Sequence, residues 1–189
     1  MRLLRCTQAI AAIEFALVLP LLLIFFLGTL EVARFALIHI KLDKTAHAMA
    51  DFLTQGDVVR FSDMDSFASS ATQIMEPYDF NGSIIFTAAT HRDVGIPPCT
   101  GSDVTCISWQ YRPIGGNISR VGSPGGHAVF PGGYLVQPDQ IAIAAEAFYN
   151  FAPLMSYTGQ IVPELAPHTM YKISVYKPRQ IGSLANPPI

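Results

Sequence analysis

Few residues in this chain could do chemistry, and they are widely spaced. Of its 189 residues, 14% are charged, against roughly 25% in an ordinary soluble domain. Neither a GxSxG nor an HExxH sequence is present, and the histidines lack the spacing of metal ligands. We therefore predict no enzyme, no metal and no cofactor, since an exported enzyme would need a convergent polar pocket that the sequence does not show. The histidines are His39, His47, His91, His127 and His168, and we interpret His39 and His47 as polar-face helix residues.

The charge balance also argues against nucleic acid as a partner. From residue 56 onward the chain has 7 Lys and Arg against 10 Asp and Glu, so it carries no basic stripe. Residues 113–138 are rich in Gly and Pro and contain three Gly-Gly pairs, but they lack the spacing of a phosphate-binding loop. We expect a long, irregular and flexible loop there.

Glu14 is the only charged residue between Ala9 and Leu30. Twelve of the sixteen residues from Phe15 to Leu30 are Leu, Ile, Val or Phe, which together favour insertion by about −4 to −7 kcal/mol. Insertion of a carboxylate at a helix centre costs about 3 kcal/mol, and less near an end. The net free energy of insertion therefore remains favourable. We predict a transmembrane helix over residues 10–30, in which Pro20 bends or loosens the backbone.

The flanks of this span suggest its orientation. Arg2 and Arg5 precede it and no acid lies before Glu14, so the positive-inside rule favours a cytoplasmic leader over residues 1–9 and an exported C-terminal side. A secretory signal cut near Ala33 is the alternative, although its apolar core would be long. A lipoprotein at Cys6 is disfavoured because Arg5 directly precedes it.

The helical pattern continues beyond the span. One apolar stripe runs through residues 31–55 at steps of three and four, and Gly56 follows as a stop signal. Glu31 and Arg34 are spaced to pair on this helix. We expect a single helix of about 45 residues, whose amphipathic second half packs on the downstream domain. The stripe consists of Phe35, Ile38, Leu42, Ala46, Met49 and Leu53.

Residues 56–189 are predicted to form an exported α+β domain. A helix capped by Ser62 or Asp63 should run to about Met75, before Pro77. Four strands should form an antiparallel sheet with one buried apolar face, covered by the amphipathic helix. Residues 183–189 are interpreted as a frayed tail. The strands are expected at 83–90, 104–111, 141–151 and 170–176. In the second strand, one face should carry Ile107, Trp109 and Tyr111, and in the fourth strand one face should carry Tyr171, Ile173 and Val175. In the third strand, one face should carry Ile141, Ile143, Ala145, Ala147, Tyr149 and Phe151.

The three cysteines divide into one isolated residue and one close pair. Cys6 lies in the expected leader, whereas Cys99 and Cys106 flank a short turn before the second strand. Outside the membrane this pair is expected to oxidise to a disulfide, closing a small loop worth roughly 2–3 kcal/mol. A zinc site is disfavoured because a second ligand pair is missing.

The sequence Ala-Ala-Ile-Glu-Phe-Ala-Leu-Val-Leu-Pro at 11–20 resembles the N-terminal motif of the TadE-like family. In that pattern small residues precede an apolar residue, Glu-Phe-Ala and an apolar run with Pro. Gly28, Glu31 and Arg34 also fall where the family tends to carry such residues. The resemblance covers about residues 9–35, and the rest resembles the family only in its order of a helix and then a β-rich domain. It implies a pilin-like arrangement and a minor pilin, or pseudopilin, of the tight-adherence (Flp-type) pilus.

The resemblance also implies a processing step. A prepilin peptidase would cut on the cytoplasmic side between Ala9 and Ile10, leaving Glu14 as the fifth mature residue. The family usually has Gly before the cut, so Ala9 is a departure. Glu14 would then pair with the terminal amine of a neighbouring subunit. The alternative is that Glu14 only snorkels to the headgroups.

The resulting hypothesis is a structural subunit of the bacterial inner membrane. It would span the membrane once, with its N-terminus cytoplasmic and its C-terminal domain periplasmic or extracellular. Its partners would be membrane lipid, other pilin or pseudopilin subunits, inner-membrane pilus assembly proteins and the prepilin peptidase. The alternative function is a membrane-anchored binding module, in which the helix is only a tether.

Overall fold

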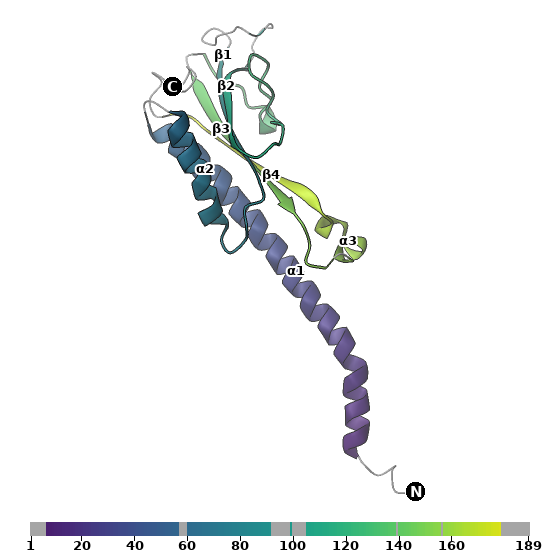
Figure 1. Cartoon of the computed structure of the whole chain (residues 1–189). Coiled ribbons are helices and arrows are strands. Elements are labelled where there is room, and N and C mark those ends of the chain that lie inside the picture. The colour runs from purple at the N-terminus through teal and green to yellow at the C-terminus, as the bar shows by residue number, and fades with distance from the viewer. Residues whose placement is uncertain are drawn as a thin grey trace. The chain divides into compact units, whose positions relative to one another are not determined.

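The structure is a computed structural model, and it describes residues 7–56, 60–91, 99, 105–138, 140–155 and 157–178. The expected leader residues 1–6, with Cys6, and the expected tail 183–189 lie outside the described residues, as does the turn between the paired cysteines. Figure 1 shows helices at the start of the chain and a sheet after them. The chain has the predicted α+β class.

Helix α1 (Thr7–Gln55) has 49 residues, close to the single long helix predicted. It runs through Pro20 without interruption. The apolar stripe of its second half is buried from Ile38 to Leu53, as its spacing predicts. Helix α2 (Phe61–Met75) follows. It begins earlier than predicted, because Arg60 occupies the N-cap and its backbone N–H donates to the Asp63 carboxylate at 3.4 Å.

The four strands form one antiparallel sheet in the order β2-β1-β3-β4. Their bounds agree with the expected ones to within a few residues, and β3 agrees at both ends. Among the described residues, three short helical segments lie between the strands. The strands are β1 (Gly82–His91), β2 (Thr105–Ile114), β3 (Ile141–Phe151) and β4 (His168–Tyr176), and the short segments are η2 (Pro131–Gly133), α3 (Thr158–Ile161) and η3 (Pro163–Leu165).

One face of the sheet packs against the C-terminal part of α1 and against α2 (Figure 1). Alternation along β3 places Ile141, Ile143 and Ala145 on this face, as predicted. Lys41 links the two helices, because its ammonium donates to the Ile74 carbonyl in the last turn of α2 at 3.1 Å, where cations are favoured. The cluster contains Met49, Ala50, Leu53, Met64, Ala68, Ala71, Ile84, Phe86, Ala88, Trp109, Ile141, Ile143 and Ala145.

The other face of the sheet is covered too, so the prediction of a half-buried sheet is wrong. Ten of the eleven β3 residues are buried, including the nine consecutive residues Ile141 to Tyr149, so side chains that point to either face are covered. The cover is the Gly/Pro-rich segment, which is irregular as predicted but packed rather than a flexible excursion. Its apolar side chains Val121, Ala128, Phe130 and Val136 form a second cluster with Ala89, Ile107, Ala142 and Ala144.

The same segment covers the outer edge of β2. The Ile107 N–H donates to the Gly126 carbonyl at 3.0 Å, and the Gly125 N–H donates to the Ile107 carbonyl at 2.9 Å. Gly122 permits this close return because its φ is +140° and a Cβ there would meet the His127 carbonyl oxygen at 2.6 Å. The start of this edge, from Thr105 to Ile107, is therefore paired within the chain, which shortens the free edge that could act as a template for aggregation.

A β-bulge corrects the prediction for β2. Ala88 pairs with Trp109, but the next residue, Ala89, pairs with Ile107, so one extra residue lies in β2. An extra residue reverses the facing of the side chains beyond it. Ile107 therefore lies in the second cluster, opposite Trp109 and Tyr111, instead of sharing their face. Ile173 and Val175 of β4 lie together on that second face, as expected.

The chain divides into two compact units. One joins α1 through Leu37 with the segment Ala152–Pro167, and the other comprises Ile38–Phe151 with the strand that begins at His168. The segment between β3 and β4 thus belongs with the first part of the long helix. The sequence did not indicate this association.

Candidate functional site: the apolar helix and the carboxylates along the chain

The first part of α1 carries its apolar side chains outward on all sides. Every residue from Ile10 to Leu30 is exposed except Gly28, which is half-buried. The most apolar part of this helix has a mean hydropathy of 2.7 with none of it buried, so the helix is long and apolar enough to cross a membrane. The core helix of a soluble protein would be buried, so this exposure calls for a non-aqueous surrounding.

Glu14 lies on this exposed surface, four residues after Ile10. One turn of helix separates the two residues, about 6 Å along the axis. Within the described part of the chain the Glu14 carboxylate has no ion pair. Ala9 and Ile10 lie in the first turns of α1. Processing between them, pairing of Glu14 and a kink at Pro20 remain predictions.

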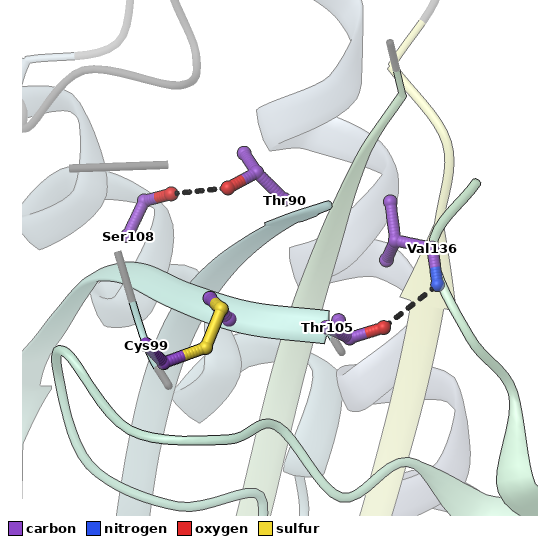
Figure 2. Close-up of a disulfide and its surroundings, with 6 residues drawn as sticks. Thr90, Cys99, Thr105, Ser108 and Val136 are labelled. Atoms are coloured by element: carbon purple, nitrogen blue, oxygen red, sulfur yellow. Dashed lines mark hydrogen bonds between the residues drawn. A yellow bond between two sulfur atoms is a disulfide. The ribbon is translucent and has the colours of Figure 1, made fainter. Parts of the chain in front are cut away.

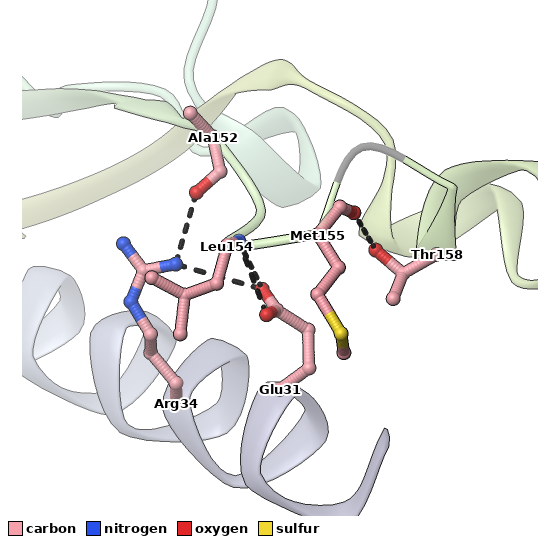
Figure 3. Close-up of polar contacts among 6 residues, drawn as sticks. All are labelled: Glu31, Arg34, Ala152, Leu154, Met155 and Thr158. Carbon is pink, nitrogen blue, oxygen red and sulfur yellow. Dashed lines mark hydrogen bonds and ion pairs between the residues drawn. The ribbon is translucent and has the colours of Figure 1, made fainter. Parts of the chain in front are cut away.

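Glu31 marks the end of the exposed apolar surface. Its carboxylate is fully buried, and the Leu154 backbone N–H donates to both of its oxygens, at 3.1 and 3.2 Å (Figure 3). This contact attaches the segment after β3 to α1 within the first compact unit. A buried carboxylate that accepts from a backbone N–H recovers part of its lost hydration.

Arg34 completes this junction. Its guanidinium lies 3.5 Å from the Glu31 carboxylate, which confirms the predicted pairing, and it donates to the Ala152 carbonyl at 2.9 Å (Figure 3). The two charged residues therefore hold both ends of one short stretch of backbone. Sequence reasoning found the pair but missed its partner segment, which lies more than a hundred residues away.

The second half of α1 has a polar side that contacts β4. His47 accepts from or donates to the Ser174 hydroxyl at 2.8 Å, and Lys172 lies 3.6 Å from Asp43. His47 is thus a polar-face residue, as predicted, but one that bonds the sheet. Within the described ranges, no three His, Cys, Asp or Glu side chains are grouped so as to hold a metal ion.

Glu146, in the middle of β3, is the carboxylate that sequence reasoning missed. It is fully buried on the second face of the sheet. The Ser119 hydroxyl donates to it, as do the Arg120 backbone N–H at 2.8 Å and the Tyr171 hydroxyl at 3.0 Å. Burial, followed by the negative charge of Glu146, raises the pKa of Tyr171, so the phenol stays a donor above the pH at which a free tyrosine ionises. Arg120 lies over the Tyr171 ring, 4.4 Å from its centroid.

Cys99 and Cys106 are joined by a disulfide at the start of β2, with their Cα atoms 5.9 Å apart (Figure 2). That separation is typical of disulfides. Two hydrogen bonds surround it: the Val136 N–H donates to the Thr105 hydroxyl at 2.8 Å, and the Thr90 and Ser108 hydroxyls lie 3.0 Å apart (Figure 2). The disulfide therefore fixes Cys99 to β2, an edge strand of the sheet.

Comparison with known proteins bears on the helix alone. No curated protein and no solved structure matches the chain. One family model matches residues 9–51. The match begins at Ala9 and reaches well into the amphipathic half of α1, beyond the residues 9–35 over which the sequence motif suggested a resemblance. The model is that of the TadE-like protein family, and the match confirms the resemblance carried by the motif around Glu14.

Proposed function

We propose that this protein is a structural pseudopilin that takes part in assembly of a tight-adherence pilus. The TadE-like family implies a role in such pilus systems, in which its members are structural proteins. The observation that carries the proposal is the long exposed apolar helix with one carboxylate near its start, continuous with a helix half that is buried in a folded domain. A helix that only anchored the protein in the membrane would need the apolar length but not the carboxylate.

The proposed assembly step gives Glu14 a physical role. A carboxylate in lipid is expensive unless it is paired. Cleavage between Ala9 and Ile10 would create an ammonium group at residue 10 of each subunit. Pairing of that ammonium with Glu14 of a neighbouring subunit would neutralise both charges at once, and would favour only those helix packings in which the two groups meet.

The proposed location is the bacterial inner membrane, crossed once, with the N-terminus in the cytoplasm. The folded domain would then lie on the periplasmic or extracellular side. The disulfide between Cys99 and Cys106 supports this side, because disulfides persist in oxidising compartments. The partners would be membrane lipid, other pilin subunits, inner-membrane assembly proteins and a prepilin peptidase.

Exchange of the anchor tests this function against a membrane-tethered binding module. We expect replacement of residues 1–30 by an unrelated single-span anchor to abolish piliation, because the new helix lacks the carboxylate and the packing surface. Piliation is measured by immunoblotting of pili sheared from cells. The exchanged protein should still reach the membrane with its disulfide formed. Full piliation with the foreign anchor would show that the helix is only a tether, and would overturn the proposal.

A further inference from the structure

An apolar groove of about 380 Å³ lies within the first compact unit. One wall is the side of α1 around Gly28. The other is the segment Ala152–Pro167 between β3 and β4, which contains α3 and η3 and which we call the α3–η3 segment. Gly28 leaves the groove open, since nothing lies within 4 Å of where its Cβ would be. The lining includes Ile24, Phe25, Val32, Tyr157, Ile161 and Leu165.

The α3–η3 segment, whose residues line the groove, also exposes large apolar side chains. Ile161 is 73% exposed and Leu154 is 70% exposed. Tyr157 and Val162 beside them are also exposed. Between Ala152 and Pro167 the only charged residue is Glu164. These side chains form an apolar surface on one short segment, and its exposure to water is unfavourable.

This surface continues the exposed surface of the apolar helix. Ile24 and Phe25 belong both to the exposed apolar run of α1 and to the groove. From Ile10 to Leu30 the helix rises about 30 Å, which is the thickness of a bilayer's hydrocarbon core. A helix that enters the hydrocarbon near Ile10 therefore leaves it near Leu30, beside the α3–η3 segment.

We propose that the α3–η3 segment lies in the outer interface of the bilayer, with Leu154 and Ile161 among the acyl chains and Tyr157 at the level of the headgroups. Tyrosine is enriched at that level because its ring is apolar and its hydroxyl is polar. The groove then takes the end of a lipid acyl chain. The junction of Glu31 and Arg34 with the segment backbone holds this second membrane contact at a set place along α1.

The occupant is lipid rather than a second copy of the chain because the groove opens on the same surface that the membrane span exposes. Two contacts with one bilayer, a spanning helix and an interfacial segment, would limit rotation and tilt of the first compact unit. The inference rests on the proposed membrane span, so its test includes a probe of the span itself.

Spin labels placed at three exposed apolar sites test the proposal in the full-length protein with Cys6→Ser. The protein is reconstituted in vesicles of phosphatidylethanolamine and phosphatidylglycerol. The test site is Ile161→Cys, the span control is Leu17→Cys, which is 75% exposed, and the matched control is Ile118→Cys, 82% exposed in the second unit. The measurement is collision of each label with oxygen, which concentrates in lipid, and with a water-soluble nickel chelate.

We expect the ratio of oxygen to nickel collisions to be severalfold higher at positions 161 and 17 than at position 118. A ratio at position 161 equal to that at 118, with position 17 still in lipid, would overturn the interfacial contact and leave the span intact. Protection of position 161 from both reagents would mean that a protein surface covers the segment, which also overturns it. A water-exposed label at position 17 would overturn the span and this inference together.

Discussion

We expect replacement of Glu14 by alanine to abolish pilus assembly, while the protein still inserts into the membrane. The substitution removes a carboxylate whose burial in a helix costs up to about 3 kcal/mol, so insertion becomes easier. What is lost is the partner for the terminal ammonium of a neighbouring subunit. We expect at least a tenfold fall in sheared pili, measured by immunoblot, with an unchanged amount of protein in the membrane fraction.

A matched glutamate controls for the loss of charge alone. Glu76 is an exposed residue at the end of α2, outside the apolar helix. Glu76→Ala should leave piliation at the wild-type level. Glu14→Asp should recover part of the assembly, because it keeps the charge but shortens the reach. If Glu14→Ala cells make normal pili, then Glu14 only snorkels to the headgroups and the assembly role fails.

Replacement of Glu146 by alanine should lower the free energy of unfolding by about 3 kcal/mol, since it removes a fully buried acceptor and leaves three part-buried donors without it. These are the Ser119 hydroxyl, the Arg120 N–H and the Tyr171 hydroxyl. They connect the Gly/Pro-rich segment and β4 to the middle of β3. The segment that covers the second face should therefore loosen first.

Denaturant unfolding of the full-length protein in detergent micelles measures this effect. Trp109 is the only tryptophan in the chain and lies buried in the first core cluster, so its fluorescence reports the domain. Glu146→Gln keeps one acceptor oxygen and should cost less than Glu146→Ala. Asn150→Ala in the same strand removes one exposed hydrogen bond and should change stability by less than about 0.5 kcal/mol. Equal stability of Glu146→Ala and wild type would contradict the proposed role of the carboxylate.

The periodic parts of the fold could be predicted because burial repeats with the backbone. The stripe from Ile38 to Leu53 follows the helical period, and the alternation along β3 identified the residues that face the helices. The motif around Glu14 likewise predicted the match to the TadE-like family model, because it is local in sequence. Each of these signals needs only neighbouring residues to be visible.

The failures come from contacts that depend on distant residues. Glycine and proline in residues 113–138 indicate an irregular backbone but not whether it packs, and Val121 and Phe130 are buried only because the second sheet face lies beneath them. The bulge that turns Ile107 to the other face is visible only in the pairing with β1. Glu146 follows five apolar residues in a strand. Its three hydrogen-bond donors come from residues about 25 positions away, so the neighbouring sequence does not indicate them.

The intact mass of the protein extracted from its native membrane tests the central claim most directly. We expect a single mature chain that begins at Ile10, lacks residues 1–9 with Cys6, and carries the disulfide between Cys99 and Cys106. Glu14 would then be the fifth residue from a free ammonium group. A mature chain that begins near Ala33 would contradict the account, because the apolar helix would have been removed as an ordinary secretory signal.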